Sequence, residues 1–327
     1  MNEDMMNIAQ AADMPEENSG NNAVPPMTFK TKLSRWWNNT GLGWAFMLPF
    51  IILFCLFVAL PIVLSLRYCF TYYNMVQPAQ FNGLENFRYM IMDDDVFRIA
   101  LGNTLKLAVV IGPVGYIASF FFAWVINNLK YRTFFVLAFY TPSIVSSVAM
   151  SVVWKVVFAS DRYGYINSWL LQAGIIDEPL LFTQDPSLII TVVIIVSLWM
   201  SLGMQFLVFI AGLQNMPTDL YEVAYIDGMS NVFQELWYIT FPMMKPQLLF
   251  GAISAITSAF QVGTICTDIA GFPSPDYCAQ TLVLHMEDYT FYRYELGYAS
   301  AVAIVLFAIT FTLGRIFMKV LSTKGEY

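Results

Sequence analysis

Six long apolar runs constrain this chain more than any other feature of its sequence. A helix needs roughly 20 residues to cross the hydrocarbon core of a bilayer, and each run is at least that long. The runs are Trp44–Leu66, Leu101–Ile126, Phe134–Phe158, Leu188–Leu213, Leu248–Ile269 and Leu296–Val320. Because lipid offers the backbone no hydrogen-bond partners, such runs cross a membrane as helices. The sequence therefore predicts an all-α integral membrane protein with six transmembrane helices.

The overall composition agrees with a membrane protein. Of the 327 residues, 58% are hydrophobic and only 12% are charged, whereas soluble domains carry about 25% charged residues. The net charge of −7 argues against a nucleic-acid partner, which a basic surface would attract. Residues 1–40 are mostly polar, so we expect a disordered cytoplasmic tail there, followed by a membrane domain over residues 41–327.

Basic residues indicate which side of the membrane is cytoplasmic. Short cytoplasmic segments carry an excess of lysine and arginine. The basic residues that mark this side are Lys30, Lys32, Arg35, Lys130, Arg132, Arg315 and Lys319. They precede the first run, join the second to the third, and end the last. We therefore expect both termini in the cytoplasm and membrane lipid around the six helices.

The stretch Pro217–Pro246 lies between the fourth and fifth runs and has helical patterning of its own. The apolar residues that share one face of a first short helix are Leu220, Val223 and Ala224. Thr218 or Asp219 can cap the start of this helix. Gly228 can end it in the left-handed conformation that side chains with a Cβ resist.

A second short helical segment follows within the same stretch. The apolar residues that share its face are Phe233, Leu236 and Trp237, and Ser230 or Asn231 can cap it. Pro242 and Pro246 then interrupt the backbone hydrogen bonding near the next membrane entry.

The apolar faces of these two short helices must be shielded from water by another surface. Interfacial membrane helices usually carry lysine and arginine on the polar face. This stretch instead holds four carboxylates, those of Asp219, Glu222, Asp227 and Glu235, against the single Lys245. Because anionic lipid would repel it, a groove in a partner protein is the better cover.

The stretch resembles the EAA loop of the permease subunits of ABC importers that depend on a binding protein. The matching residues are Glu222, Val223, Ala224, Asp227, Gly228 and the sequence Ile239–Pro242. Val223 and Phe241 depart from the usual alanine and leucine, and the spacing from Gly228 to Ile239 is one residue longer than usual. The preceding residues 211–214 and 220–222 are similar to the carbohydrate branch, which includes maltose, multiple-sugar and glycerol-3-phosphate importers.

This resemblance implies a type I ABC importer permease fold, with the EAA loop at about 215–247 between spans four and five. It implies a second homologous permease as partner, commonly in a heterodimer, and a dimer of cytoplasmic ATPases that bind ATP and Mg²⁺. An extracellular binding protein would deliver a sugar or oligosaccharide across a bacterial cytoplasmic membrane. The residues that would couple the permease to the ATPase are Glu222, Ala224, Asp227, Gly228 and Pro242.

The sequence lacks the motifs of an enzyme. It contains no GxxxxGK[ST] phosphate-binding loop, no HExxH and no GxSxG, so we expect a transport subunit without an ATPase site of its own. An ion-coupled secondary transporter or a channel, with the 217–246 stretch on the bilayer surface, is the alternative. It is weakened because the interiors of the runs hold no Asp or Glu, which ion paths commonly use.

Cysteine and histidine give no metal or cofactor pattern either. Cys55, Cys69, Cys266 and Cys278 form no CxxC, and no pair has the spacing of metal ligands. The one histidine, His285, is expected to be structural or solvated. Cys69 and Cys278 both fall near the outer face, and a disulfide between them is left open.

Four residues within the runs are candidates for the substrate pathway. Polar groups are sparse near mid-membrane, and the candidates there are one large ring, Trp199, and the polar residues Gln205, Thr257 and Gln261. An amide in hydrocarbon needs a hydrogen-bond partner, which a solute could supply. Helix packing is the alternative interpretation for these residues, and also for the small residues of 297–301.

Overall fold

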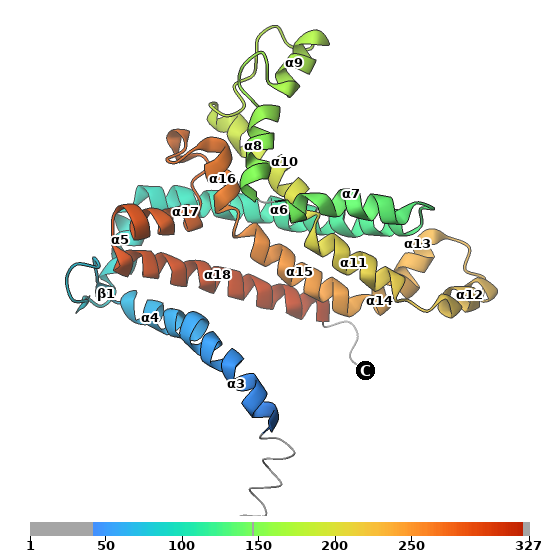
Figure 1. Cartoon of the computed structure of the whole chain (residues 1–327), viewed down its shortest axis with the longest axis horizontal. Coiled ribbons are helices and arrows are strands. Elements are labelled where there is room, and N and C mark those ends of the chain that lie inside the picture. The colour runs from blue at the N-terminus through green and yellow to red at the C-terminus, as the bar shows by residue number, and fades with distance from the viewer. Residues whose placement is uncertain (1–41, 146, 323–327) are drawn as a thin grey trace, which may run out of the picture. The chain divides into compact units, whose positions relative to one another are not determined.

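The computed structural model of the chain describes residues 42–145 and 147–322 (Figure 1). The expected cytoplasmic tail of residues 1–40 lies outside the described residues. The chain divides into two compact units, Met1–Pro61 and Ile62–Tyr327.

The described part of the first unit is helical. It contains α3 (Leu42–Phe54), the π-helical turn η2 (Cys55–Ala59) and the start of α4 (Leu60–Tyr68). Together these elements form one helical segment, Gly43–Tyr68, that is long and apolar enough to cross a membrane. It coincides with the first apolar run.

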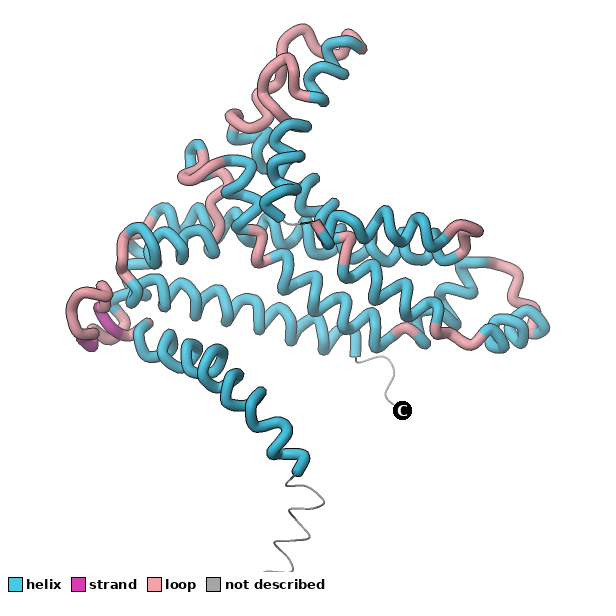
Figure 2. Tube along the Cα trace, viewed as in Figure 1, coloured by secondary structure: helices cyan, strands magenta, loops and turns pink. Residues whose placement is uncertain are grey.

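The second unit is almost entirely helical, and loops join its helices (Figure 2). A small antiparallel hairpin pairs β1 (Thr71–Tyr72) with β2 (Gln80–Phe81). The α-helices are α5 (Glu85–Met92), α6 (Asp95–Asn127), α7 (Arg132–Ile144), α8 (Ser147–Val157), α9 (Tyr165–Gln172), α10 (Pro186–Ser201), α11 (Met204–Gln214), α12 (Thr218–Ile226), α13 (Val232–Glu235), α14 (Phe241–Met243), α15 (Lys245–Ala259), α16 (Gly263–Ala270), α17 (Leu282–Glu287) and α18 (Leu296–Ser322). Two π-helical turns, η3 (Leu236–Thr240) and η5 (Asp288–Tyr292), and the 3₁₀ turn η4 (Pro275–Tyr277) complete it.

Helix α6 organises the packing of this unit. It contacts α10, α11, α15 and α17, and α15 in turn contacts α18, as Figure 1 shows. The buried side of α6 carries small or apolar residues at helical spacing, which lets neighbouring backbones approach closely. At Gly115, for example, an added Cβ would lie 2.6 Å from the Ser201 hydroxyl of α10.

Within the described ranges, four helices are long and apolar enough to cross a membrane. They are Gly43–Tyr68, Asp95–Asn127, Pro186–Gln214 and Leu296–Lys319, and they match the first, second, fourth and sixth apolar runs. A fifth candidate is a bent pair, Val232–Met243 with Lys245–Ala259, whose halves meet at 80°. Pro242 and Pro246 flank this bend, as the sequence predicted.

The third and fifth apolar runs do not form single long helices. The third run is divided between α7, which ends at Ile144, and α8, and the fifth between α15 and α16 at residues 260–262. The fourth run is interrupted by a two-residue turn, Leu202 and Gly203, between α10 and α11. Ser143 of α7 lies so close to Gly203 that a Cβ there would overlap the serine. Four to five spans are therefore evident, and six remains a prediction.

Candidate functional site

The 217–246 loop contains two short helical segments joined by a sharp turn. Gly228 lies just beyond α12 with a φ of +90°. The N–H of Gly228 donates to the carbonyl of Tyr225 at 3.2 Å, and that of Met229 donates to Ala224 at 3.0 Å. This pair of bonds is the Schellman motif, in which a left-handed residue ends a helix. The predicted end of the helix at a left-handed Gly228 is therefore confirmed.

The two helix starts in this loop differ from each other. Asn231 caps the second segment, because its Oδ1 accepts a hydrogen bond from the Phe233 N–H at 3.0 Å, as predicted. The predicted cap of α12 by Thr218 or Asp219 is wrong. The helix already includes Thr218, and the capping position belongs to Pro217, whose side chain has no acceptor.

The two segments expose apolar side chains together with the predicted coupling residues. Ile226 is 84% exposed, Phe233 75% and Trp237 70%. Glu222 and Asp227 are also exposed, whereas Ala224 is half-buried. Such an apolar surface, edged by carboxylates, is the kind that a protein partner covers.

The base of the loop is anchored to the helices of the second unit. The ring of Phe241 lies 5.2 Å from that of Phe120 on α6, and Thr240 and Met244 are buried. The neighbouring Pro242 is exposed. A movement of the loop would therefore reach α6 and α15 directly.

A cavity of about 510 Å³ lies where three helices are interrupted. The described residues around it come from α6, from α7 and from the α10–α11 and α15–α16 breaks. Its hydroxyl groups belong to Ser143, Ser197, Ser201, Ser254, Thr257 and Ser258, and its amides to Gln205 and Gln261. None of the described lining residues is charged at neutral pH.

The cavity collects three of the four predicted pathway residues. Gln205, Thr257 and Gln261 line it, but Trp199 does not. The ring of Trp199 instead contacts Trp154 edge-to-face, with ring centroids 6.0 Å apart. Thr257 donates to the carbonyl of Ile253 on its own helix, a bond typical of threonine in membrane helices.

Two buried polar atoms of the cavity lack a protein partner. Gln205 is 5% exposed and Ser197 4%, and neither Oε1 of Gln205 nor Oγ of Ser197 has a hydrogen-bond partner among the described residues. A buried polar group left unpaired costs about 1–3 kcal/mol.

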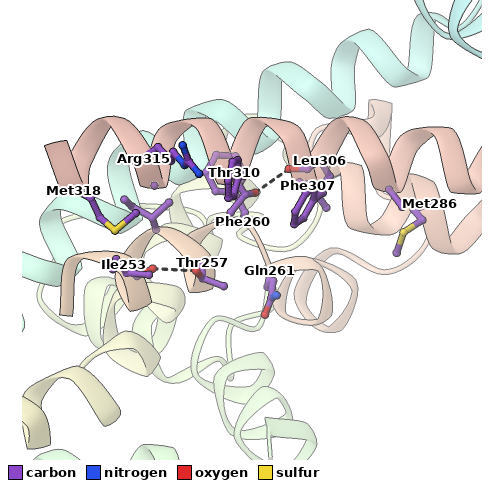
Figure 3. A pocket seen from close by; sticks show the side chains of 14 residues that line it. Ile253, Thr257, Phe260, Gln261, Met286, Leu306, Phe307, Thr310, Arg315 and Met318 are labelled. Carbon is purple, nitrogen blue, oxygen red and sulfur yellow. Dashed lines mark hydrogen bonds between the residues drawn. The ribbon is translucent and has the colours of Figure 1, made fainter. Parts of the chain in front are cut away.

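A second cavity, of about 420 Å³, lies between α15 and α18 (Figure 3). Thr257 and Gln261 line this cavity as well as the first, so α15 separates the two. Most of its other lining side chains are apolar, including Phe307, and Arg315 lies near one end (Figure 3). Its character is that of an apolar groove.

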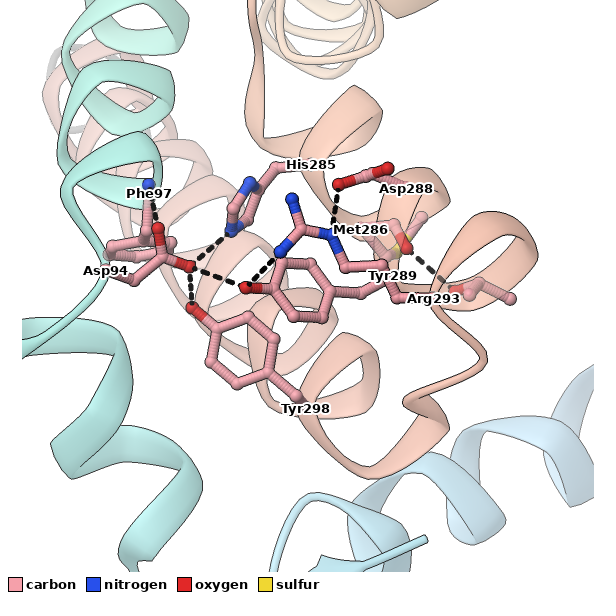
Figure 4. A network of polar contacts seen from close by, with 9 residues as sticks. Asp94, Phe97, His285, Met286, Asp288, Tyr289, Arg293 and Tyr298 are labelled. Atoms are coloured by element: carbon pink, nitrogen blue, oxygen red, sulfur yellow. Dashed lines mark hydrogen bonds and ion pairs between the residues drawn. The ribbon is translucent and has the colours of Figure 1, made fainter. Parts of the chain in front are cut away.

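A buried polar network joins α6, α17 and α18 (Figure 4). Asp94 caps α6, because its Oδ1 accepts from the Phe97 N–H at 2.8 Å. Its Oδ2 accepts from the hydroxyls of Tyr298 at 2.6 Å and Tyr289 at 3.3 Å. Nε2 of His285 lies 3.0 Å from the same oxygen. His285 is thus structural, one of the two roles expected for it.

The charges of this network stabilise one another. Burial raises the pKa of Asp94, but hydrogen bonds from His285, Tyr298 and the Phe97 N–H outweigh it and hold that pKa well below its usual range. Arg293 donates to the Tyr289 hydroxyl at 3.1 Å and also lies over its ring. Asp94 therefore remains a carboxylate, fully supplied with donors.

Sequence reasoning did not find this network. Asp94 lies within a run of three aspartates before the second apolar run. The available sequence signal was the preference of aspartate for the N-cap of a helix. Its partner His285 lies 191 residues away, so no local pattern links them.

The cysteines are free thiols among the described residues. Cys69 packs in one hydrophobic cluster with Met90 and Phe97, whereas Cys278 packs against another, around Cys266. The structure therefore has no bridge between Cys69 and Cys278.

Comparison with known proteins gives a family for this architecture. The profile of the family described as binding-protein-dependent transport system inner membrane component matches residues 98–324. A probable ABC transporter permease of Bacillus subtilis strain 168 is 32% identical over 294 residues, which cover 87% of this chain and 92% of that protein. The lactose transport system permease of Rhizobium radiobacter is 31% identical over 283 residues, which cover 85% of this chain and 93% of that protein.

Solved structures show the same fold. A bacterial ABC transporter that imports the acidic polysaccharide alginate has a chain that superposes with a TM-score of 0.78 at 21% identity. The match covers 90% of this chain and 100% of the other. The same kind of transporter in complex with an alginate pentasaccharide-bound periplasmic protein gives a TM-score of 0.76, also at 21% identity, over 91% of this chain and 99% of the other.

Proposed function

The chain belongs to the binding-protein-dependent transport system inner membrane component family, and from this premise we propose that it is a permease subunit of an ATP-driven sugar importer. The names of its relatives support a sugar or oligosaccharide as solute. They include permeases for lactose, for arabinooligosaccharides and for multiple sugars. An extracellular binding protein would deliver the solute, as in the solved complex with a periplasmic protein.

The observation that carries this proposal is the exposed apolar surface of α12 and α13. Their apolar side chains lie in solvent among carboxylates, which favours a protein groove over an anionic membrane surface. We assign this groove to a cytoplasmic ATPase that binds ATP and Mg²⁺, since the sequence has no phosphate-binding loop. Exposed Glu222 would accept a charge-assisted hydrogen bond from a basic residue of the ATPase.

The loop is built to transmit movement in both directions. The Schellman turn at Gly228 fixes α12 relative to the second segment. The Tyr225 hydroxyl donates to Glu235 at 3.4 Å and ties the two segments together. Phe241 then leads into α6 and α15 through its ring contact with Phe120. ATP binding would shift α12, and the α6–α15 pair beside the cavity would follow.

The remaining features of the proposed importer concern its assembly and topology. This chain would pair with a second homologous permease in a bacterial cytoplasmic membrane. It would cross that membrane six times with both termini inside, the third and fifth spans being the divided helices. Gln205, Thr257 and Gln261 would line its half of the pathway, and Trp199 of α10 would pack against Trp154 outside the cavity.

Site-directed cross-linking tests the assigned ATPase contact. Ile226→Cys places a thiol at the most exposed apolar position of α12, and Tyr163→Cys places one at an equally open site, 91% exposed, beyond α8. With a short bifunctional reagent in membranes that contain the whole complex, we expect Ile226→Cys to cross-link to the ATPase and Tyr163→Cys not to. Equal cross-linking of both variants, or of neither, would contradict the docking.

A further inference from the structure

We propose that the groove between α15 and α18 binds an anionic phospholipid, with an acyl chain along the groove and the phosphate at Arg315 (Figure 3). This groove is the second cavity, of about 420 Å³, and its described lining residues come mainly from α15 and α18. A lipid there would be a binding partner beyond the proposed import function. Only its assignment to the cytoplasmic leaflet rests on the topology proposed with that function.

The groove is long enough for an acyl chain. Its lining residues on α18 extend from Ala303 to Met318. At about 1.5 Å per residue, this part of the helix is about 22 Å long. One leaflet contributes about 15 Å, half of the roughly 30 Å of the hydrocarbon core. A chain that spans one leaflet therefore fits along the groove.

The walls of the groove offer few polar groups to a ligand. Thr257 and Thr310 line it, but each hydroxyl donates to a carbonyl of its own helix, at 2.9 Å in both cases. The one amide among the described lining residues, that of Gln261, lies away from Arg315 (Figure 3). Because an acyl chain has no hydrogen-bonding groups, it suits walls whose hydroxyls are already satisfied.

Gly314 leaves the groove open beside Arg315. An added Cβ at Gly314 would meet no atom within 4 Å, so no neighbouring helix requires a glycine there. Glycine is also less favourable than alanine inside a helix. Since Gly314 lines the groove, a larger side chain at this position would enter it. The glycine therefore preserves space for a ligand.

Arg315 supplies the positive charge that a phosphate needs. It is the only charged residue among the described lining residues, it is exposed, and it forms no ion pair with a described residue. Its guanidinium lies 4.8 Å from the ring centroid of Phe311 on the same helix. Exposed Lys319 follows one turn later on the same side of α18. A guanidinium can hold a phosphate through two parallel hydrogen bonds.

The position of Arg315 along α18 favours a phospholipid over a second protein helix. From Leu296, the first residue of α18, to Arg315 the helix rises by about 28 Å. A helix that enters the core near Leu296 thus brings Arg315 to the opposite headgroup region. Basic pockets between transmembrane helices on the cytoplasmic side bind anionic headgroups. An apolar protein helix would fill the groove but would give Arg315 no anion.

The lipid retained by the purified complex tests the role of the charge. The complex is placed in nanodiscs of equal parts phosphatidylglycerol, which is anionic, and phosphatidylcholine, which has no net charge. It is then extracted in detergent, and its bound lipids are quantified by mass spectrometry. We expect the wild-type complex to retain phosphatidylglycerol about fivefold over phosphatidylcholine. Equal retention of the two lipids would overturn the proposal.

Three variants assign this preference to Arg315. Arg315→Gln should lose it, and Arg315→Lys, which keeps the charge, should retain it. The matched control is Arg132→Gln, which removes an exposed charge at the start of α7, outside the groove and on the side expected to be cytoplasmic. This control should behave as the wild type. The wild-type preference in Arg315→Gln would refute the site.

A second pair of variants tests the apolar part of the groove. Gly314→Phe places a ring in the groove, and Gly102→Phe places one at an equally open position of α6 that lines neither cavity. We expect Gly314→Phe to lower the retained phosphatidylglycerol to the level of Arg315→Gln, and Gly102→Phe to match the wild type. Unchanged retention in Gly314→Phe would place the lipid elsewhere and contradict the proposal.

Photo-cross-linking identifies what occupies the groove. Phe307 lines it and is 63% exposed, so a benzophenone-bearing phenylalanine in its place samples the interior. In the complete complex, in the same nanodiscs, we expect adducts with phosphatidylglycerol. Adducts with the second permease, or with the helical segment Gly43–Tyr68, would show that protein covers the groove and would overturn the proposal.

Discussion

At the scale of single residues, Asp94 makes the clearest contribution to stability. Its Oδ2 serves three donors in a buried site, and hydrogen bonds to a charged group are stronger than neutral ones by about 1 kcal/mol each. Asp94→Asn should therefore lower the free energy of unfolding by about 3 kcal/mol. The measurement is the thermal unfolding temperature of the purified complex at neutral pH.

Asp95→Asn is the matched control for this variant. The Asp95 side chain is 86% exposed and pairs with exposed Arg98, so the change should cost under about 1 kcal/mol. The pKa of Asp94 is lowered below the unfolded value of about 3.9, so its stabilisation is complete at neutral pH and is lost only in strong acid. Equal unfolding temperatures for the two variants at neutral pH would contradict the role of Asp94.

Single residues also show what local sequence can and cannot reveal. Gly228 and Asn231 were predictable because a helix end and a cap depend on chemistry within a few residues. The start of α12 was mispredicted by one position, since Thr218 and Asp219 suit a cap but Pro217 occupies that place. The link between Asp94 and His285 depends on how distant helices pack, which no local pattern encodes.

At the scale of elements, hydropathy located the membrane helices but not their interruptions. A window average of hydropathy depends on composition, so a few non-helical residues, such as Val145 or residues 260–262, leave it unchanged. Gln261, an amide within the fifth apolar run, was a local sign of the break between α15 and α16. The cavity that these breaks surround was therefore beyond prediction, although three of its residues were named.

The six-span arrangement gives a labelling prediction at this scale. Asn128→Cys, exposed in the turn between α6 and α7, should be protected from an impermeant thiol reagent applied outside intact cells. Tyr163→Cys, exposed beyond α8, should react. Neighbouring Gly164 is buried against Ala159 and is unsuitable for a probe. The opposite labelling pattern would reverse the orientation, and labelling of both would contradict the path of the third span.

At the scale of the whole molecule, the proposed docking loop precedes α15 in the chain, and the cavity lies at the break that follows α15. Phe241 at the base of the loop contacts Phe120 of α6, and Ile111 of α6 lines the cavity, so α6 links the base of the loop to the polar cavity. The central claim is that ATP binding to a partner ATPase drives a shift of α12. A variant that distorts only the turn after α12 tests it.

Uptake of solute into proteoliposomes that hold the complete complex is the most direct measurement. Gly228→Val and Gly174→Val both place a side chain at a left-handed residue with open space around it, so each adds about 1–3 kcal/mol of backbone strain and no clash. We predict that Gly228→Val abolishes uptake driven by internal ATP and the binding protein, while Gly174→Val retains it. Wild-type uptake by Gly228→Val, or uptake by the wild type with an ion gradient and no ATP, would contradict the account.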